Sequence, residues 1–204
     1  KMTILIIGNS IHLCEAIRSA YPDDVINIIP WRNNFIDLPQ MENDLVFIVG
    51  FDYDSYMKKY DAYMNVNVTQ PLFAIERFAK STADKVYIAT QSENKNFTFS
   101  RYRYAKEKLA QLLLAQRQNS YVLRFDTFVS RNHEPLIKGG SITKFIFNTL
   151  VKINFVKTVD MTTVSNRIKN YKIHSSEDIS DIKGIFVNLP RPQFIDRFMR
   201  LILA

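Results

Sequence analysis

A tyrosine and a lysine stand four residues apart, Tyr102 and Lys106, in a stretch rich in helix-forming residues. In an α-helix this spacing puts both side chains on one face, one turn apart. An ammonium beside a phenol favours the phenolate, so such a pair can move a proton to or from a hydroxyl or carbonyl. Tyr104 and Lys108 repeat the spacing, so the residues alone leave the register open. A solvated helix face of mixed tyrosines and bases would carry the same pattern.

The elements that must position this pair alternate along the chain. Apolar, β-branched runs predict strands at 3–7, 25–29, 45–49, 86–90 and 121–125. Helical patterns fill the intervals at 11–21, 55–80 and 102–117, with Pro71 as a kink or restart in the second. This alternation predicts an α/β fold, namely a Rossmann-type doubly wound parallel sheet with helices on both faces.

The pattern weakens after residue 130. A helix is expected at 141–151, short strands within 153–174, and two more helices at 175–182 and 192–203. We therefore expect a Rossmann-like nucleotide-binding core over 1–130. Residues 131–204 are expected to form a small C-terminal appendage on the substrate side, packed on the same domain.

In parallel sheets of this kind the ligand crevice lies at the carboxyl ends of the strands. Glycine or polar residues mark those ends here: Gly8, Asn9 and Ser10, then Arg32, Gly50, Thr90 and Arg124. Several such strand ends on one edge of the sheet predict a binding site there.

Taken in order, these segments resemble the short-chain dehydrogenase/reductase superfamily, in its extended or atypical branch of NAD-dependent epimerases and dehydratases. A strand that ends in Thr90 is followed, after a loop, by Tyr102-x-x-Ala105-Lys106. Upstream, Asn67 lies in a segment similar to the family's asparagine-bearing helix. Downstream, the strand 121–125 is similar to a Leu-Arg-Pro strand of the sugar-nucleotide-modifying branch. The resemblance covers about residues 2–130.

The resemblance assigns roles to four residues. Tyr102 would be the acid/base, and Lys106 would hold the cofactor ribose and tune Tyr102. Thr90 would hydrogen-bond the substrate oxygen, with Ser92 as the alternative. Asn67 would support a proton-relay water.

The family's Gly-x-x-Gly-x-x-Gly turn is only partly kept. Gly8 stands in the first position, but Ile11 and Cys14 occupy the other two. In the family this turn brings backbone N–H groups of a helix N-terminus to the pyrophosphate. A branched residue such as Ile11 would be strained at positive φ and would crowd the phosphate.

The expected cofactor residues are therefore Gly8, Asn9, Ser10, Ile11, Arg32 and Gly50, together with Lys106. Arg32 after the second strand suits a 2′-phosphate, which favours NADP over NAD. Trp31 could flank an adenine. The altered turn also leaves open that no dinucleotide binds.

Two functions follow. The first is an NAD(P)-dependent reductase, epimerase or dehydratase acting on a sugar nucleotide or similar phosphorylated small molecule, as in polysaccharide biosynthesis. The second is a catalytically degenerate Rossmann-fold binding or regulatory protein that has lost dinucleotide binding. The altered turn and the short C-terminal region favour the second. The retained Tyr102, Lys106, Thr90 and Asn67 favour the enzyme, which we prefer.

The composition of the chain limits the classes of partner that we expect. A net charge of +7 favours an anionic small molecule, and no recognisable nucleic-acid-binding module is present. One cysteine and no apolar run approaching the ~20 residues of a membrane span indicate a cytoplasmic protein. Its three histidines and one cysteine match no metal-ligand spacing. By analogy, helices 55–80 and 101–117 would form a homodimer.

Overall fold

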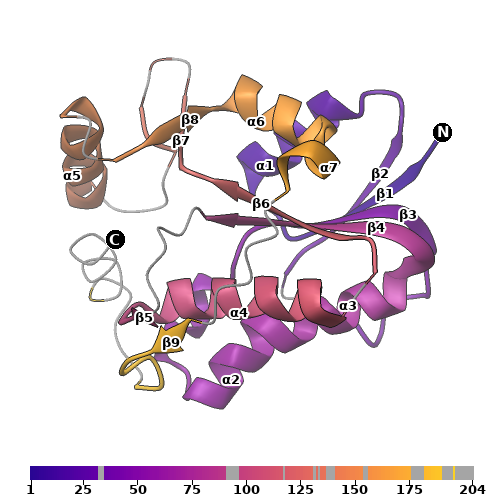
Figure 1. Cartoon of the computed structure of the whole chain (residues 1–204), viewed down its shortest axis with the longest axis horizontal. Helices are drawn as coiled ribbons and strands as arrows, with labels where there is room; N and C mark the ends of the chain where they lie inside the picture. Colours follow the sequence, from indigo (N-terminus) through magenta and orange to yellow (C-terminus); the bar gives the residue numbers. More distant parts are fainter. Residues whose placement is uncertain are drawn as a thin grey trace.

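Five parallel strands form the central sheet of the computed structural model, with helices on both faces (Figure 1). The structure describes residues 1–31, 35–90, 97–116, 118–130, 132, 134–136, 141–153, 156–175, 182–189 and 195. The side chains of Thr90, Gln116 and residues 141–144 are outside this description. The arrangement confirms the predicted Rossmann-type α/β class.

The strands follow the order β2-β1-β3-β4-β6. Their bounds are β1 Thr3–Ile7, β2 Val25–Ile29, β3 Asn43–Ile48, β4 Ala79–Thr90 and β6 Ser120–Phe125. The chain runs outward from β1 to β2 and then crosses to β3 on the other side of β1. The strand order therefore reverses between β1 and β3, which is where open α/β sheets form their ligand crevice.

Each face of the sheet is buried by its own helices. On one face lie α1 (Ile11–Ala20), α6 (Met161–Lys169) and α7 (Tyr171–His174), above the sheet in Figure 1. On the other lie α3 (Gln70–Phe78) and α4 (Arg101–Gln116). The strands are apolar on both sides because alternate residues enter different cores: Ile4, Ile6 and Phe47 on the α1 side, Leu5, Ile7 and Tyr87 on the α4 side.

The helix expected at 55–80 is divided and ends early. Tyr53–Met57 is a 3-10 helix, Tyr60–Met64 is α2, Asn65–Thr69 is a π-helical turn, and α3 follows with Pro71 in its first turn. A proline is tolerated there because the first N–H groups of a helix need no intrahelical partner. The chain then turns into β4 at Ala79 rather than at residue 86, because Ala79 pairs with Asn43 before a register shift.

Short elements outside the central sheet lie beside the carboxyl ends of its strands (Figure 1). They include α5 (Ser141–Lys152) and two parallel strand pairs. In the first pair β7 (Thr127–Val129) meets β8 (Thr158–Asp160), and in the second β5 (Phe97–Thr98) meets β9 (Lys183–Gly184). The first pair links a strand before residue 130 to a strand after it. The division of the chain at residue 130 stays a prediction.

The expectation of short strands within 153–174 is met by one strand, but most of the range is helical. Among the described residues of this range, β8 is the one strand, and α6 and α7 follow it. Asp160 caps α6 by accepting a hydrogen bond from the Thr163 N–H at 2.9 Å. Val164 and Ile168, four residues apart, are fully buried beside α1. The helices expected at 175–182 and 192–203 fall almost entirely outside the described residues.

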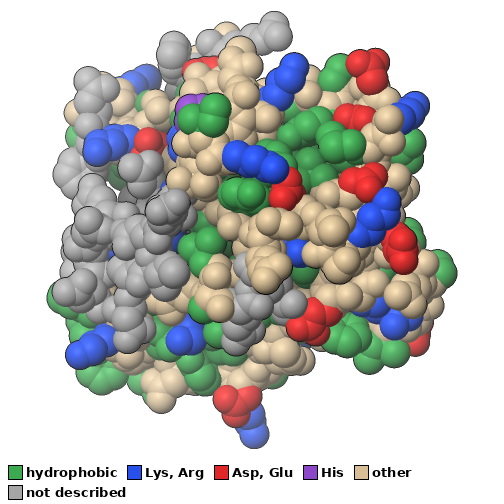
Figure 2. All heavy atoms as spheres, turned by 45° about the vertical axis from the view of Figure 1, so that its right-hand side comes forward, with side chains coloured by type: hydrophobic (Ala, Val, Ile, Leu, Met, Phe, Trp, Pro, Cys, Tyr) green, Lys and Arg blue, Asp and Glu red, His purple; other side chains and the backbone are tan. Residues whose placement is uncertain are grey.

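No helix of the described part of the chain is long and apolar enough to span a membrane. On the face turned forward in Figure 2, lysines and arginines are interspersed with acidic side chains rather than gathered in one basic patch. On this face, therefore, the excess positive charge is spread out.

Candidate active site

Tyr102 and Lys106 both lie on the side of α4 that faces the sheet. Each is 5% exposed, and the Lys106 Nζ atom is 5.4 Å from the centre of the Tyr102 ring. The ammonium donates a hydrogen bond to the Ile88 carbonyl oxygen on β4 at 3.5 Å. The side chains of the pair thus meet as the helical spacing predicts. Their catalytic roles stay a prediction.

The alternative register does not face the sheet. Tyr104 packs at Gly184 of β9, where a Cβ atom would approach its ring to 2.9 Å. Its side chain also hydrogen-bonds Tyr60, and the pKa of Tyr60 rises to about 12 because of burial first and this bond second. Tyr104 therefore belongs to the contact between α2, α4 and β9.

Two aromatic rings from the end of β3 cover Tyr102. The Phe51 ring meets the Tyr102 ring edge-on, with 4.7 Å between the ring centroids. The Tyr53 ring stacks on the Tyr102 ring, with 5.9 Å between the centroids and 15° between the planes. Phe51 follows Gly50 directly after the strand, and Tyr53 comes two residues later as the first residue of the 3-10 helix. These contacts place Tyr102 within an aromatic cluster.

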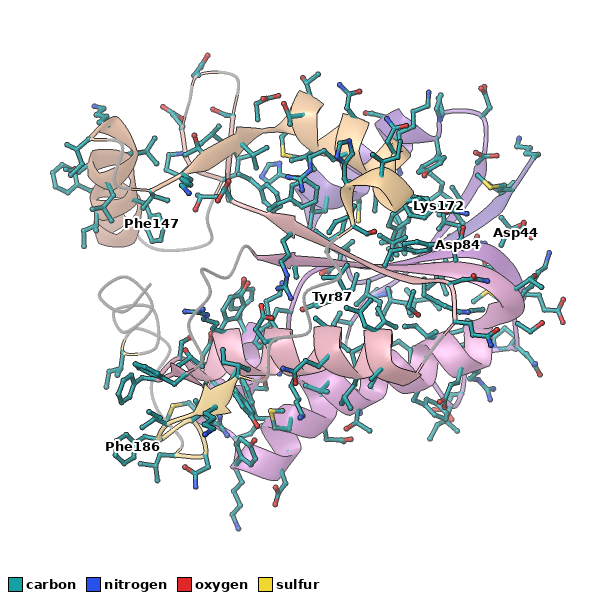
Figure 3. The ribbon with its side chains drawn as sticks, viewed as in Figure 1. Asp44, Asp84, Tyr87, Phe147, Lys172 and Phe186 are labelled. Carbon is teal, nitrogen blue, oxygen red and sulfur yellow. The ribbon has the colours of Figure 1, made fainter. Side chains whose placement is uncertain are left out.

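Tyr87 lies beneath the pair and was not foreseen. Figure 3 shows it between the sheet and α4, and the Lys106 Nζ atom is 5.5 Å from the centre of its ring. Burial first, and then the neighbouring Tyr102 and Glu107, raise the pKa of the Tyr87 phenol well above its usual value. The available signal was the strand alternation, which puts Tyr87 on the α4 side.

Both polar atoms of the Asn67 side chain make hydrogen bonds within the fold. Its Oδ1 atom accepts the Asp52 N–H at 2.9 Å, and its Nδ2 group donates to the Ser55 Oγ atom at 2.8 Å and the Tyr63 carbonyl oxygen at 3.0 Å. It lies in the π-helical turn and is 1% exposed. π-Helical turns are frequent at functional sites. Here Asn67 ties this turn to the segment after β3, and its proton-relay role stays a prediction.

Arg101 was also missed by the sequence reasoning, although it precedes Tyr102 directly. Its side chain is fully buried, and its Nη1 atom donates to the carbonyl oxygens of Tyr56 at 2.9 Å and Lys58 at 3.1 Å. The guanidinium lies 4.2 Å from the centre of the Tyr63 ring. Arg101 therefore anchors the segment that carries Tyr53 to the first turn of α4.

A buried ion pair joins α4 to β6 on the same side of the sheet. The Arg124 guanidinium donates to the Glu107 carboxylate at 2.5 Å, and these side chains are 13% and 2% exposed. The Arg124 carbonyl oxygen accepts a hydrogen bond from Arg167 of α6 at 3.1 Å. Arg124 thus links the helix that carries Tyr102 to the opposite layer.

The structure explains why the first residue of the turn after β1 is a glycine. Gly8 has a φ of +118°, and a Cβ atom there would lie 1.9 Å from the Val49 carbonyl oxygen. The strain expected at Ile11 is absent, because Ile11 is the first residue of α1 and has helical backbone geometry. Its side chain is 70% exposed. Cys14 is buried, and burial raises the pKa of its thiol.

The start of α1 fits an anionic group. The side chain of Ser10, the N-cap residue, makes no capping hydrogen bond, and the first turn contains no acidic residue. Helix N-termini of this kind present N–H groups and a positive dipole to phosphates. Asn9 is exposed beside it. Gly50 has a φ of +87°, and among the described residues no atom lies within 4 Å of the place a Cβ would occupy, so their packing leaves space at the end of β3.

The side chains of three residues predicted for the site lie outside the described part of the chain. Thr90 ends β4 opposite Phe125 of β6, but its side chain lies outside the described part of the chain. Arg32 and Ser92 are outside it altogether. Trp31 is 5% exposed and its Nε1 atom donates to the Val66 carbonyl oxygen at 3.1 Å, and its place beside an adenine stays a prediction. The described residues contain no group of three or more potential metal ligands.

Comparison with known proteins identifies structural neighbours. No family model and no curated protein matches the sequence. ADP-L-glycero-D-manno-heptose-6-epimerase from Helicobacter pylori is similar in structure, with a TM-score of 0.59 and 13% identity over 91% of this chain and 76% of the epimerase. RMD from Pseudomonas aeruginosa, complexed with NADPH, has a TM-score of 0.54 and 11% identity over 83% of this chain and 73% of RMD.

A third neighbour is similar over nearly its full length. The protein lin1944 from Listeria innocua has a TM-score of 0.51 and 8% identity, with 90% of this chain and 98% of lin1944 aligned. At these identities the likeness is one of fold. The Rossmann-type fold that the resemblance implies is thus confirmed, and the chain shares it with these three proteins.

Proposed function

We propose that the chain is an NAD(P)-dependent enzyme of the reductase, epimerase or dehydratase type, acting on a sugar nucleotide or a similar phosphorylated small molecule. The observation that carries the proposal is the Tyr102–Lys106 pair, which α4 presents to the sheet beside β4. Two structural neighbours support it, since one is a heptose-6-epimerase and the other is complexed with NADPH.

In this proposal the turn at Gly8, Asn9, Ser10 and Ile11 holds the pyrophosphate at the start of α1, beside the open space at Gly50. A bound nicotinamide would supply or accept a hydride. Tyr102 moves a proton at its phenol oxygen, while Lys106 keeps positive charge beside that phenol. Thr90 orients the substrate oxygen.

Tyr53 and Phe51 bear on this role, because they cover Tyr102. Their rings exclude water from the phenol, which strengthens its interaction with the Lys106 ammonium. Substrate access then requires the segment at Tyr53 to move. Arg32 would make the cofactor NADP, and we also propose a cytoplasmic homodimer, by analogy with relatives.

A binding or regulatory protein is the second candidate. Two observations favour it: Ile11 projects from the helix start where the family has a glycine, and Tyr102 is almost fully enclosed. In this candidate the aromatic cluster is part of the hydrophobic core, and the carboxyl edge of the sheet binds an anionic ligand without catalysing a reaction.

A thermal shift experiment with NADPH and NADH separates the candidates. A ligand at a hundredfold excess over its Kd stabilises the folded state by about 2.7 kcal/mol. For a chain of this size that corresponds to a rise in Tm of roughly 5–10 °C. We expect such a rise with NADPH, both for the wild type and for Tyr102→Phe, since that change removes only the proton donor. No rise with either nucleotide would overturn the enzyme proposal.

A further inference from the structure

The Lys106 ammonium is held between two aromatic rings. Its Nζ atom lies 5.4 Å from the centre of the Tyr102 ring and 5.5 Å from the centre of the Tyr87 ring. Both distances are within the range of cation–π attraction, about 6 Å. One ring comes from the same helix, one turn earlier, and the other from β4, so the two rings fix the ammonium from different elements.

We propose that Tyr87 is a positioning residue, whose ring holds the Lys106 ammonium in place beneath Tyr102. The proposal rests on the proposed function for the role of Tyr102, but the contact itself belongs to the free protein.

Burial gives this contact its importance. Lys106 and Tyr87 are 5% and 1% exposed, so the ammonium is largely removed from water. A buried charge is costly unless neighbouring groups stabilise it. The Ile88 carbonyl oxygen accepts its hydrogen bond at 3.5 Å, the long limit for such a bond. The negative faces of two desolvated rings then make a substantial contribution, since cation–π attraction grows where water is excluded.

The charged and titratable groups around this contact come from three elements. Tyr102 and Glu107 lie on α4, Arg124 on β6, and Tyr53 on the segment after β3. The carboxylate of Glu107 is engaged by Arg124. On β4, the Lys106 ammonium contacts the Tyr87 ring as well as the Ile88 carbonyl oxygen. Figure 3 shows Tyr87 reaching from the sheet toward α4.

The test replaces Tyr87 by phenylalanine and then by phenylalanines with two and five ring fluorines, which weaken the negative face while nearly keeping its shape. The readout is the pH at the midpoint of the titration of the Lys106 ε-methylene signal, followed by 13C NMR on the protein without cofactor. The signal is assigned by its loss in Lys106→Met. We expect Tyr87→Phe to match the wild type and the most fluorinated ring to lower the midpoint by about one unit, a tenfold loss of proton affinity.

Phe47 provides the matched control, because it is a fully buried ring on the opposite face of the sheet. The same fluorinated residues there should leave the Lys106 midpoint unchanged. Equal midpoints across the Tyr87 series would overturn the proposal, as would an equal effect at Phe47. Since no nucleotide is present, this outcome is independent of whether the protein binds NADPH.

A second measurement uses Tyr87→Leu, which removes the ring. It should shift the pH midpoint of the Tyr102 13Cζ signal in the wild-type background but not in Lys106→Met, since Tyr87 acts through Lys106. The same shift in both backgrounds would show a general packing effect and contradict the proposal.

Discussion

The ring of Tyr53 lies nearly parallel to that of Tyr102, with 15° between the planes and 5.9 Å between the centroids. Tyr53 belongs to the 3-10 helix after β3, and Tyr102 to the first turn of α4. The stack therefore closes the candidate phenol from the carboxyl edge of the sheet. It also depends on Arg101, which fastens the 3-10 helix through the Tyr56 and Lys58 carbonyl groups.

Removing this cover should expose Tyr102. We predict that Tyr53→Ala raises the nitration rate of Tyr102 severalfold, because the stacked ring no longer shields it. Peptide mass spectrometry resolves Tyr102 from Tyr104, which packs at Gly184 and hydrogen-bonds Tyr60 and serves as the internal reference. Tyr53→Phe keeps the stack and should nitrate at the wild-type rate. An unchanged rate in Tyr53→Ala would mean that Tyr53 does not control access.

Asn67 should be needed for stability whether or not it takes part in catalysis. Asn67→Leu leaves the Asp52 N–H and the Tyr63 carbonyl oxygen without the bonds they make to its amide. Each buried polar group left without a partner costs about 1–3 kcal/mol. We expect a loss of about 2–4 kcal/mol in urea unfolding. Asn65→Leu, an exposed change in the same turn, is the control and should cost far less.

The Glu107–Arg124 ion pair predicts a strongly non-additive double-mutant cycle. Removing one partner of a buried pair costs about 3–5 kcal/mol, because the other charge is left buried without compensation. Arg124→Met should show such a loss in urea unfolding. Glu107→Leu combined with Arg124→Met should recover most of it, since the pair is then replaced by apolar contacts. Additive losses would show that the two side chains do not stabilise each other.

The sheet could be predicted from the sequence because its strands contain short apolar runs, and the central strands β1 and β3 are buried on both faces. β1 and β2 match their predicted bounds, since Thr3–Ile7 and Val25–Ile29 are short apolar runs that end at glycine and proline. The meeting of Tyr102 and Lys106 could also be predicted, because it depends only on the period of one helix.

Features set by distant contacts could not be predicted in this way. The helix α6 has only Val164 and Ile168 fully buried, and its packing partner α1 lies far away in the sequence. The cover over Tyr102 likewise depends on how Arg101 holds the 3-10 helix. Ile11 was expected to be strained by analogy with a glycine, yet an ordinary helical start removes that strain.

The side chain of Ile11 gives a direct test of the altered turn. We predict that Ile11→Gly tightens NADPH binding by about threefold to tenfold, because removing the exposed branched side chain lets a phosphate approach the start of α1. Titration calorimetry measures the change. Ile173→Gly removes an isoleucine that is 80% exposed on α7 and should leave the affinity unchanged. Equal or weaker binding by Ile11→Gly would place the phosphates elsewhere.

The alkaline stability of the protein should depend on Tyr21. Burial, and then the negative charges of Asp24 and Asp84, raise the pKa of its phenol to about 12. An unfolded tyrosine ionises near pH 10, so the unfolded state loses this proton first as the pH rises. The stability that Tyr21 contributes is therefore complete below about pH 10 and is lost between pH 10 and about 12.

Tyr21→Phe should remove this part of the pH dependence. At pH 8 the variant should be less stable by about 1 kcal/mol, because the hydroxyl no longer donates to the Ile168 carbonyl oxygen, a bond of 3.3 Å. Above pH 10 its unfolding free energy should fall less steeply, by up to about 1–2 kcal/mol after solvent screening, so the two curves converge. Urea unfolding at pH 8, 10 and 11 measures this, and parallel curves would contradict the assignment to Tyr21.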